Sequence, residues 1–523
     1  MKKKLLLLGL TINSLFALNQ NSSPVVNIQN IVVDDIQEQV IITYNLADLD
    51  DDECDVWLKA ALNGDDFFTE VNLDELSGDI GTSVSPGSDK TIVWNYSELP
   101  GTINIVKIRL YASDNKELDV HSMVNQVDSN LLLQNLSYLE GIRHFSAAPD
   151  HLDVVRDSIE ANFYRYGLAT ERHLFSYQDN EGVNILGRKS GAKDEAITFI
   201  IDGHYDGVPN SPAADDNGTA VAGMLEVLRI VSQYEFEHSI RFIGFDFEEL
   251  GLIGSNRYVQ NGIASYEDIQ GVLNLEMIGY KSDEPNSQTL PDGFEIIFPD
   301  AVDEIAANEY RGDFLVVCGN DNSSSLITDY INASEQYVPD LKTIRIQVAG
   351  NGEIAPDLRR SDHTPFWESG RKALMLTDGA DTRNQNYHTM GDSIGTLDFD
   401  FMTNVVKATL GTLAELAVPI SAGHDEFDLA TLAIEHNHSH SPSIEVFPNP
   451  TNGEFIIKID AQHNLKQRLD VYNLQGQVVE TKIFDVQHGS SSHSIDLTNL
   501  NSGKYILIFK SKEGELSKSL IIE

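Results

Sequence analysis

Two kinds of hydrophobic pattern divide the chain. Between Pro24 and Glu117, and again from Ile444 onward, short apolar runs alternate with polar positions and are separated by turn residues, which predicts β-strands. Val40–Tyr44 and Thr91–Trp94 are typical runs of the first region. We therefore expect a small β-sandwich near each end of the chain, an accessory domain over 24–120 and a second sandwich over 444–523.

In the middle of the chain, from residue 125 to 420, predicted strands alternate with longer amphipathic helices. The run Ile197–Ile201 predicts a buried strand, and Val221, Leu225 and Leu228 lie on one face of a predicted helix. Further strands are expected at 240–245, 271–275 and 373–377, and a closing helix at 401–416. Apolar strands that alternate with helices predict an α/β fold with a mainly parallel, doubly wound sheet covered by helices. Reactive residues in such sheets lie just beyond the C-terminal ends of the strands.

The first residues have the features of an export signal. Three lysines at positions 2–4 precede an apolar stretch of about 12 residues that ends at Ala17. We interpret 1–17 as a signal peptide, with a buried N-terminal helix as the alternative. This stretch, like every later one, is shorter than the roughly 20 apolar residues of a membrane span. A polar stretch at 421–443 is interpreted as a linker.

Composition narrows the function classes. With 523 residues the chain is long enough for about three domains. Its net charge of −45 argues against nucleic acid or an anionic membrane as partner. The only two cysteines, Cys54 and Cys318, cannot form a thiolate metal cluster, so a metal site would use His, Asp and Glu. The acidic loop at 48–53 offers oxygen ligands for calcium, but its spacing matches no calcium-binding loop and favours a solvated loop.

Polar residues follow the predicted strands of the middle region. His204 comes directly after the first of them and can present a ring nitrogen to a metal, while Asp206 can accept its other N–H. Asp215 and Asp216 precede the next helix, where an aspartate can be a ligand or only a helix cap. Taken alone, each of these features is more often structural.

Three later segments add more metal-binding side chains. Glu248 and Glu249 follow the strand 240–245, Glu276 follows the strand 271–275, and a late loop contains Tyr387 and His388. Carboxylates after a buried strand are costly unless they are paired, coordinated or solvated. Together with His204 they provide two histidines and several carboxylates, the donor set of a two-metal hydrolase.

These motifs, in this order, resemble the co-catalytic zinc aminopeptidases of the bacterial leucyl aminopeptidase and glutamate carboxypeptidase family. The resemblance rests on Gly203–Asp206, Asp215–Asn217, Glu248–Gly251, Asn274–Gly279, Ser361–Phe366 and Tyr387–Thr389. It covers about residues 125 to 419, and it implies an α/β zinc-exopeptidase fold.

The resemblance also implies a role for each site residue. His204 and Glu276 would bind one zinc ion, Glu249 and His388 the other, and Asp216 would bridge the two. Glu248 would be the general base, Asp206 would orient His204, and Tyr387 would hydrogen-bond the oxyanion of the tetrahedral intermediate. Glu276 stands where many members of the family have Asp. For His363 a supporting role at the site and a purely structural role remain open.

The C-terminal region resembles the sorting domain of cargo of the type IX secretion system. The residues that carry this resemblance are Phe447–Pro450, Val471–Gln477 and Leu500–Tyr505. It implies export through the periplasm and across the outer membrane, with the secretion machinery as partner. The mature protein would then be secreted or held at the cell surface. A carbohydrate-binding sandwich is the alternative.

The leading hypothesis is a secreted di-zinc metallo-exopeptidase that hydrolyses peptide bonds, with an aminopeptidase favoured. The alternatives are a single-zinc glutaminyl cyclase on the same fold and a carboxypeptidase that acts on acidic dipeptides. A surface binding protein with an inactive peptidase fold is a third. No motif indicates the preferred substrate side chain, the role of the N-terminal sandwich or the oligomeric state.

Overall fold

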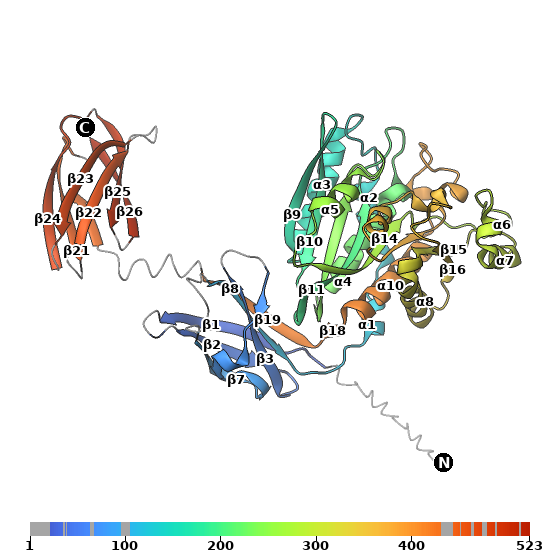
Figure 1. The fold of residues 1–523 in the computed structure, drawn as a ribbon, viewed down its shortest axis with the longest axis horizontal. Helices are drawn as coiled ribbons and strands as arrows, with labels where there is room; N and C mark the ends of the chain where they lie inside the picture. Colours follow the sequence, from blue (N-terminus) through green and yellow to red (C-terminus); the bar gives the residue numbers. More distant parts are fainter. Residues whose placement is uncertain are drawn as a thin grey trace, which may run out of the picture. The chain divides into compact units, whose positions relative to one another are not determined.

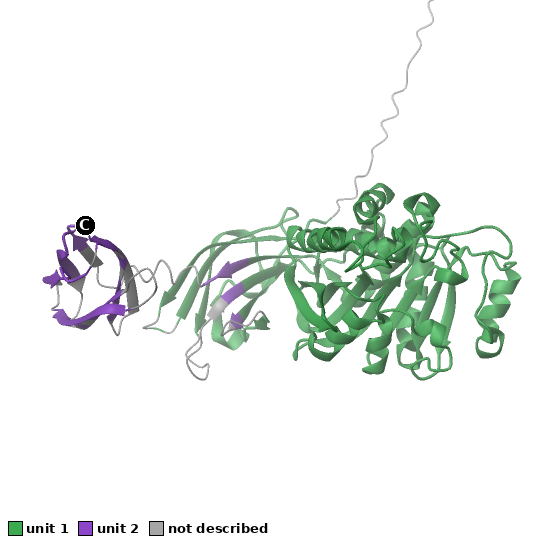
Figure 2. Cartoon of the chain, turned by 90° about the horizontal axis from the view of Figure 1, so that it is seen from above, with its two compact units in different colours: residues 1–60, 66–101, 109–425 green, residues 61–65, 102–108, 426–523 purple. Residues whose placement is uncertain are grey.

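The structure is a computed structural model. It describes residues 21–34, 37, 39–62, 67–95, 105–429, 443–449, 451–461, 465–472, 478–486, 489–500, 502–511 and 514–522. The chain divides into two units, one of residues 1–60, 66–101 and 109–425 and one of residues 61–65, 102–108 and 426–523 (Figure 2). The predicted signal peptide and residues 430–442 of the predicted linker lie outside the described residues.

The N-terminal region forms two antiparallel sheets. Its elements are β1 (Val25–Asp34), β2 (Gln39–Ala47), β3 (Cys54–Leu62), β4 (Thr69–Glu70), η1 (Leu73–Glu75), β5 (Leu76–Gly78), β6 (Gly81–Val84), β7 (Gly87–Asn95) and β8 (Ile105–Ser113). One sheet has the order β1-β2-β7-β5 and the other β19-β8-β3-β4, with β6 paired to β3. Along β2, Val40, Ile42, Tyr44 and Leu46 are buried, so the period of two seen in the sequence marks the inner face.

The structure differs from the sequence prediction at the start of the predicted linker. Strand β19 (Ala422–Asp428) is an edge strand of the second sheet. An edge strand is held by backbone hydrogen bonds and needs few apolar side chains. Because only Ala422 of β19 is buried, the composition of this strand resembles that of a linker.

The large middle region contains an eight-stranded mixed sheet (Figure 1). Its strands are β9 (Ala169–Tyr177), β10 (Asn180–Lys189), β11 (Asp194–His204), β13 (His238–Phe245), β14 (Asp268–Glu276), β15 (Phe314–Asn320), β16 (Lys342–Val348) and β17 (Ala373–Thr377). The order is β16-β15-β17-β14-β11-β13-β10-β9. The central strands β13, β11, β14 and β17 are parallel, while β9, β10 and the β15–β17 pairing are antiparallel.

Helices cover both faces of this sheet (Figure 1). They are α1 (Val120–Val124), α2 (Ser129–Leu139), α3 (Pro149–Arg165), α4 (Ala220–Val231), α5 (Ile253–Asn261), α6 (Phe294–Ile297), α7 (Pro299–Ala307), α8 (Ser324–Tyr337), α9 (His363–Glu368) and α10 (Phe399–Ala417). Ile201 packs into the core under α2, α3, α4, α8 and α10, and its neighbour Ile200 into the core under α5, α6, α7 and α9. The predicted doubly wound α/β fold is confirmed.

Shorter elements complete the region. They are η2 (Ala214–Thr219), η3 (Asp321–Ser323), η4 (Pro356–Arg359), η5 (Ala380–Thr382), η6 (Ile394–Thr396) and the two-stranded sheet of β12 (Glu235–Phe236) and β18 (Pro419–Ile420). Cys54 and Cys318 are both buried and free. No helix within the described ranges is long and apolar enough to cross a membrane.

The N-terminal sheets hold the end of β11 that lies away from His204. Trp57 Nε1 donates to the Ala192 carbonyl oxygen at 2.9 Å, and buried Lys59 Nζ donates to the Gly191 carbonyl oxygen at 3.0 Å. The backbone N–H of Phe68 donates to the Glu195 carboxylate at 3.0 Å. These contacts fix the start of the strand, at the opposite end from His204.

The second unit contains a two-sheet β-domain. Its strands are β20 (Ser443–Phe447), β21 (Glu454–Ala461), β22 (Leu465–Tyr472), β23 (Val478–Val486), β24 (Gly489–Asp496), β25 (Gly503–Ser511) and β26 (Gly514–Ile522). The sheets have the orders β20-β21-β24 and β23-β22-β25-β26. Ile457, Leu469 and Leu507 are among the residues of their shared core.

Candidate metal centre

The predicted site residues lie at one edge of the eight-stranded sheet. His204 is the last residue of β11 and Glu276 the last residue of β14, its parallel neighbour. Glu249 follows β13 on the other side of β11, and Asp216 lies in η2 before α4. His388 lies in the loop after β17. Because parallel strands end at the same edge, these separate segments bring five potential ligands together.

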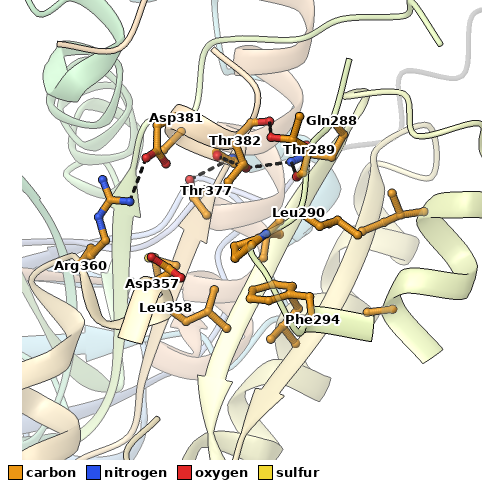
Figure 3. Close-up of a pocket in the computed structure, with 18 of the residues that line it drawn as sticks. Gln288, Thr289, Leu290, Phe294, Asp357, Leu358, Arg360, Thr377, Asp381 and Thr382 are labelled. Carbon is orange, nitrogen blue, oxygen red and sulfur yellow. Dashed lines mark hydrogen bonds and ion pairs between the residues drawn. The ribbon is translucent and has the colours of Figure 1, made fainter. Parts of the chain in front are cut away.

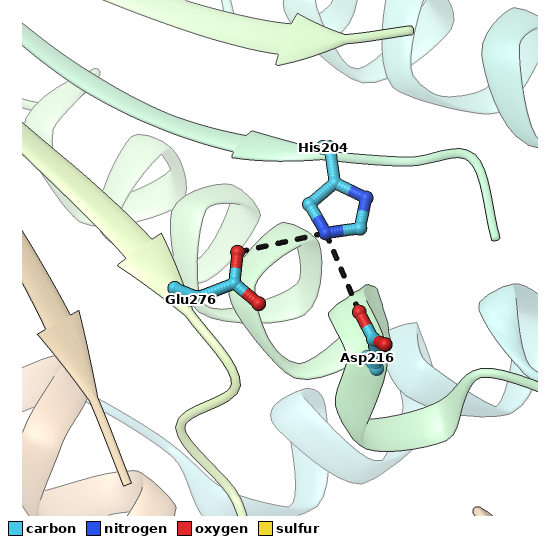
Figure 4. Close-up of side chains that lie close together, drawn as sticks. All are labelled: His204, Asp216 and Glu276. Carbon is cyan, nitrogen blue, oxygen red and sulfur yellow. Dashed lines mark ion pairs between the residues drawn. The ribbon is translucent and has the colours of Figure 1, made fainter. Parts of the chain in front are cut away.

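One group of ligand atoms surrounds His204. Its Nε2 atom lies 3.4 Å from Oδ1 of Asp216 and 3.6 Å from Oε2 of Glu276 (Figure 4). All three side chains are buried. This is the first of two groups with the spacing of metal ligands.

The second group surrounds His388. Its Nε2 atom lies 3.0 Å from Oδ2 of Asp216 and 3.2 Å from Oε2 of Glu249. Asp216 thus faces each histidine with a different carboxylate oxygen. It is the one residue that the two groups share.

The unpartnered atoms of these groups fit a bound cation. The Nε2 atoms of His204 and His388 and Oε1 of Glu249 are buried and have no hydrogen-bond partner within the described part of the chain. Buried polar atoms are normally satisfied, so these three require something that the protein itself does not supply. A set of imidazole nitrogens and carboxylate oxygens suits a divalent transition metal such as zinc.

The two ligand groups together form a negatively charged site. Burial lowers the pKa of His388, but the adjacent carboxylates of Asp216 and Glu249 outweigh it and raise the pKa to about 10. Burial raises the pKa of Asp216, yet the two histidines hold it below its usual range. Burial and the nearby Asp216 raise the pKa of Glu249 to about 7. The carboxylates therefore repel one another and favour positive charge between them.

Glu248 lies beside the ligands without belonging to either group. Its Oε2 atom is 3.9 Å from Nε2 of His204. Burial raises its pKa well above the usual value, His204 opposes this rise and Glu276 adds to it. A buried carboxylate with a raised pKa is suited to taking up and releasing a proton.

Asp206 supports several of these residues at once. Its Oδ1 atom lies 3.4 Å from Nδ1 of His204 and accepts the backbone N–H of Glu248 at 3.1 Å. Its Oδ2 atom accepts the backbone N–H of Glu249 at 3.2 Å. The sequence indicated only the link to His204. The links to Glu248 and Glu249 appear only in the structure.

Two parts of the chain match known families. Residues 184–413 match the model of Peptidase family M28. This part of the chain belongs to that family. Residues 445–523 match the Secretion system C-terminal sorting domain, which confirms the predicted sorting domain and the prediction of a secreted or cell-surface protein.

Three curated relatives match parts of the chain. "Uncharacterized protein YfbL" of Escherichia coli is 28% identical over 226 residues, which are 41% of this chain and 66% of the relative. "Aminopeptidase YwaD" of Bacillus subtilis is 37% identical over 20% of this chain and 24% of its own. "Leucine aminopeptidase 1" of Aspergillus niger is 26% identical over 51% and 61%. The chain thus spans less than two thirds of the full length of each relative.

Solved structures also match. The LapA aminopeptidase of Legionella pneumophila is 19% identical, with a TM-score of 0.44, over 57% of this chain and 74% of the other. Glutaminyl cyclase of Porphyromonas gingivalis is 15% identical, with a TM-score of 0.42, over 57% and 99%.

The structure also distinguishes the roles of Asp215 and Asp216, for which the sequence left a metal ligand and a helix cap open. Oδ1 of Asp215 accepts the backbone N–H of Gly279 at 3.0 Å, and Oδ2 accepts from Asn384 at 2.8 Å. Asp215 is therefore occupied by structural hydrogen bonds, while Asp216 faces the two histidines.

Asp392 is a supporting residue of the candidate site that the sequence did not indicate. Its two oxygens accept the backbone N–H groups of Asp215 at 2.8 Å and of Asp216 at 3.2 Å. The side chain is fully buried. Its position shortly after His388 in the sequence is the one signal that could have suggested it.

Tyr387 and Arg360 form one edge of the site. The Tyr387 ring stacks on His388 with a centroid distance of 3.7 Å, and its hydroxyl oxygen accepts from Arg360 at 3.0 Å. Arg360 also pairs with Asp381 at 3.0 Å. Burial raises the pKa of Tyr387 far above its ordinary value, so the phenol keeps its proton.

The Ser361 motif contributes in two ways. Ser361 Oγ donates to Oε2 of Glu276 at 2.7 Å and so orients that residue. His363 is fully buried, with Nε2 3.0 Å from the Leu358 carbonyl oxygen and its ring edge-on to Trp367. Burial lowers the pKa of His363 to about 3. Its Nδ1 atom lies 3.3 Å from Oδ1 of Asn274, and it belongs to neither ligand group, so it packs as a core residue.

A cavity of about 520 Å³ adjoins the candidate metal centre through Glu276, and Figure 3 shows part of its lining. Glu276 and Tyr387 are part of its lining, and the rest comes from segments between residues 288 and 382. No sequence motif indicated it.

Proposed function

We propose that the chain is a zinc-dependent exopeptidase that removes N-terminal residues from peptides. The observation that carries the proposal is Asp216, whose two oxygens face two separate histidine and carboxylate groups. Glu248 lies beside them as a carboxylate outside either group. The match to Peptidase family M28, and relatives named aminopeptidase, support the same reaction class.

The ligand residues would form two zinc sites. His204 and Glu276 would hold one zinc ion, Glu249 and His388 the other, and Asp216 would contribute one oxygen to each. Zinc bound there supplies Lewis acidity, which polarises a peptide carbonyl and lowers the pKa of a water molecule.

The remaining residues handle the proton and the developing charge. Glu248 takes the proton of the attacking water and passes it to the leaving amine, so no covalent acyl-enzyme is needed. Asp206 fixes the backbone of Glu248 and the ring of His204. Because the Tyr387 oxygen accepts from Arg360, its own proton is free to be donated to the oxyanion of the tetrahedral intermediate.

The rival hypothesis is glutaminyl cyclisation with a single zinc ion. The presence of two complete ligand groups, rather than one, favours the di-zinc peptidase. A carboxypeptidase for acidic dipeptides is the other rival, and it differs in which end of the peptide must be free. The sorting domain supports the secretion machinery as partner and peptides outside the cell as substrates.

The test is a zinc count combined with a substrate panel. The protein is stripped with a chelator, loaded with zinc and analysed by mass spectrometry of bound metal and of reaction products. We expect two zinc ions per chain and release of N-terminal residues from unblocked peptides. The variant His388→Ala should retain about one ion. His424→Ala, which changes a histidine on β19 outside the ligand groups, should retain two.

Each rival predicts a different result. One tightly bound zinc in the active protein, with ammonia released from N-terminal glutamine, would establish the cyclase. Release of C-terminal residues from N-blocked acidic dipeptides would establish the carboxypeptidase. Failure to turn over any member of the panel while two zinc ions are bound would favour an inactive binding protein.

A further inference from the structure

One arginine is completely buried beside the loop that joins two of the candidate ligands. Arg143 is 0% exposed and lies between α2 and α3, outside residues 184–413, which match the family model. Its side chain contacts the loop of residues 205–213, which runs from His204 at the end of β11 to η2, where Asp216 lies. This loop contains no helix or strand, so regular backbone hydrogen bonds do not determine its shape.

The guanidinium group binds both ends of this loop. Nε donates to the Tyr205 carbonyl oxygen at 2.8 Å, and Nη2 donates to the Ala213 carbonyl oxygen at 2.7 Å. Nη1 donates to the Pro212 carbonyl oxygen at 3.3 Å and also to two carbonyl oxygens of residues 139–141. A buried carbonyl group without a partner is costly, so Arg143 provides partners that the irregular loop lacks.

The backbone around Arg143 is tied to the same loop. The N–H of Gly207 donates to the Arg143 carbonyl oxygen at 2.7 Å, and the N–H of Gly141 donates to the Pro212 carbonyl oxygen at 2.8 Å. Ala213 has a left-handed backbone with φ of 54°, which is unfavourable for a residue with a Cβ atom. Such strain persists only where surrounding contacts hold it, and the bond from Arg143 to Ala213 is one of them.

The positive charge of Arg143 lies near the carboxylates of the metal centre. Burial lowers the pKa of Arg143, and Asp392, Asp216 and Asp206 oppose this. Within the described part of the chain, the hydrogen bonds of the guanidinium all go to backbone carbonyl oxygens. Arg143 therefore acts on the ligands through the loop, and not as a ligand or a proton donor.

We propose that Arg143 is a positioning residue for the ligand group around His204. It holds both ends of the loop, and so it sets the separation of His204, which directly precedes the loop, and Asp216, which follows it. Glu249 and His388 of the other group lie on different segments, so that group should depend less on Arg143. The proposal rests on the proposed zinc-dependent function.

The first test measures zinc affinity in one ligand group at a time. His388→Ala leaves the group around His204 intact, and His204→Ala leaves the other group intact. Arg143→Lys keeps the charge but replaces the planar fork with one nitrogen, which cannot hold both ends of the loop. By competition with a chelator, Arg143→Lys should lower zinc affinity about 10- to 100-fold in the His388→Ala protein and less than about 3-fold in the His204→Ala protein.

Arg241 provides the matched control. It is a buried arginine on β13 whose Nε donates to the Glu267 carboxylate at 2.9 Å. Glu267 directly precedes β14, at the opposite end of that strand from Glu276. Arg241→Lys should leave zinc affinity unchanged in both proteins. Arg143→Gln repeats the comparison with a neutral side chain.

The second test uses Ala213, the strained residue of the loop. Glycine adopts the left-handed conformation without the cost that a Cβ atom brings. Adding Ala213→Gly to Arg143→Lys in the His388→Ala protein should therefore restore zinc affinity by about 5-fold. The visible spectrum of cobalt(II) bound in place of zinc reports coordination geometry, so Arg143→Lys should change it and Ala213→Gly should partly reverse the change. A spectrum that Arg143→Lys leaves unchanged would contradict the positioning role.

The outcomes separate this proposal from the proposed function. If the Arg143 variants weaken both ligand groups equally, or neither, the positioning role is wrong and the peptidase function stands. If circular dichroism shows that neither Arg143 variant folds while Arg241→Lys does, Arg143 serves the fold as a whole and the positioning role is wrong. If only the group around His204 is weakened but the wild type hydrolyses no peptide, the peptidase function is wrong and the positioning role stands.

Discussion

The metal centre and the cavity beside it share Glu276 and Tyr387 but are built in different ways. The candidate ligands are polar residues: His204, Asp216 and Glu276 are buried, while Glu249 and His388 are half-buried. All but His388, which lies in a loop, lie at or near the end of a strand or before a helix. Much of the cavity lining consists of apolar residues from strands and helices that meet only in the folded chain. The difference indicates that the chemistry of the site is encoded in short motifs, while the shape of the cavity comes from long-range packing.

The largest expected effect should separate the two regions completely. Glu248→Gln removes the proton acceptor and keeps the shape of the side chain, so kcat should fall by about 10³-fold. Zinc content and the relative binding of different peptides should not change. Steady-state kinetics and metal analysis check this, with Glu295→Gln on the exposed surface of α6 as control. Residual activity above about a tenth would exclude Glu248 as the base.

A smaller effect is expected from the support of the metal centre. Asp206→Asn leaves one oxygen where two carboxylate oxygens accept the N–H groups of Glu248 and Glu249. We expect zinc affinity to fall by about 10- to 100-fold, with the ratio of Phe to Ala turnover unchanged once zinc is saturating. Competition with a chelator measures the affinity, and exposed Asp303→Asn on α7 is the control. An unchanged affinity would mean that Asp206 does not support the ligands.

The converse change should affect only the cavity. Phe294 packs edge-on against Phe298 with a centroid distance of 5.0 Å and forms part of one wall. Phe294→Ala widens the cavity and removes packing contacts, so we expect the melting temperature to drop. Zinc content should stay the same. Loss of zinc in this variant would show that the two regions are not separable.

The smallest effect concerns the core under the metal centre. Burial holds the pKa of His363 at about 3, whereas the pKa of a histidine in the unfolded chain is about 6.5. The unfolded chain therefore binds this proton first. The stability that neutral His363 provides is complete above about pH 6.5 and is lost as the pH falls toward 3.

His363→Gln should lack this pH dependence. Melting temperatures measured between pH 7 and pH 5 should converge for the wild type and the variant as the pH falls. The neighbouring Asp202 and Asp362 have raised pKa values because they are buried, so they titrate in the opposite sense in both proteins and cancel in the comparison. Parallel curves would show that His363 is not buried as a neutral residue.

Some features were predictable because they are local. The apolar run before His204 and the alternation of strands and helices indicated an α/β sheet with polar residues at its strand ends, and the fold class is confirmed. The antiparallel outer strands and the edge strand β19 were not anticipated. The pairing partner of a strand depends on distant segments, and an exposed edge strand has little apolar pattern of its own.

The residues that support the ligands, Asp206 and Asp392, were also only partly predictable from the sequence. The sequence suggested Asp206 because it lies two positions from His204. Its hydrogen bonds to Glu248 and Glu249, and those of Asp392 to the Asp215–Asp216 backbone, join segments far apart in the chain. No spacing rule connects such partners.

The sequence by itself determined the α/β fold class, the candidate ligands His204, Asp216, Glu249, Glu276 and His388, and the sorting domain. It could do so because the type of side chain, and its place just after an apolar run, are local properties of the chain. Only the tertiary structure decided that Asp216 faces both histidines, that Asp215 is structural, and that a cavity adjoins the ligands. These features are distances and shapes between segments that close packing brings together, and no single segment contains them.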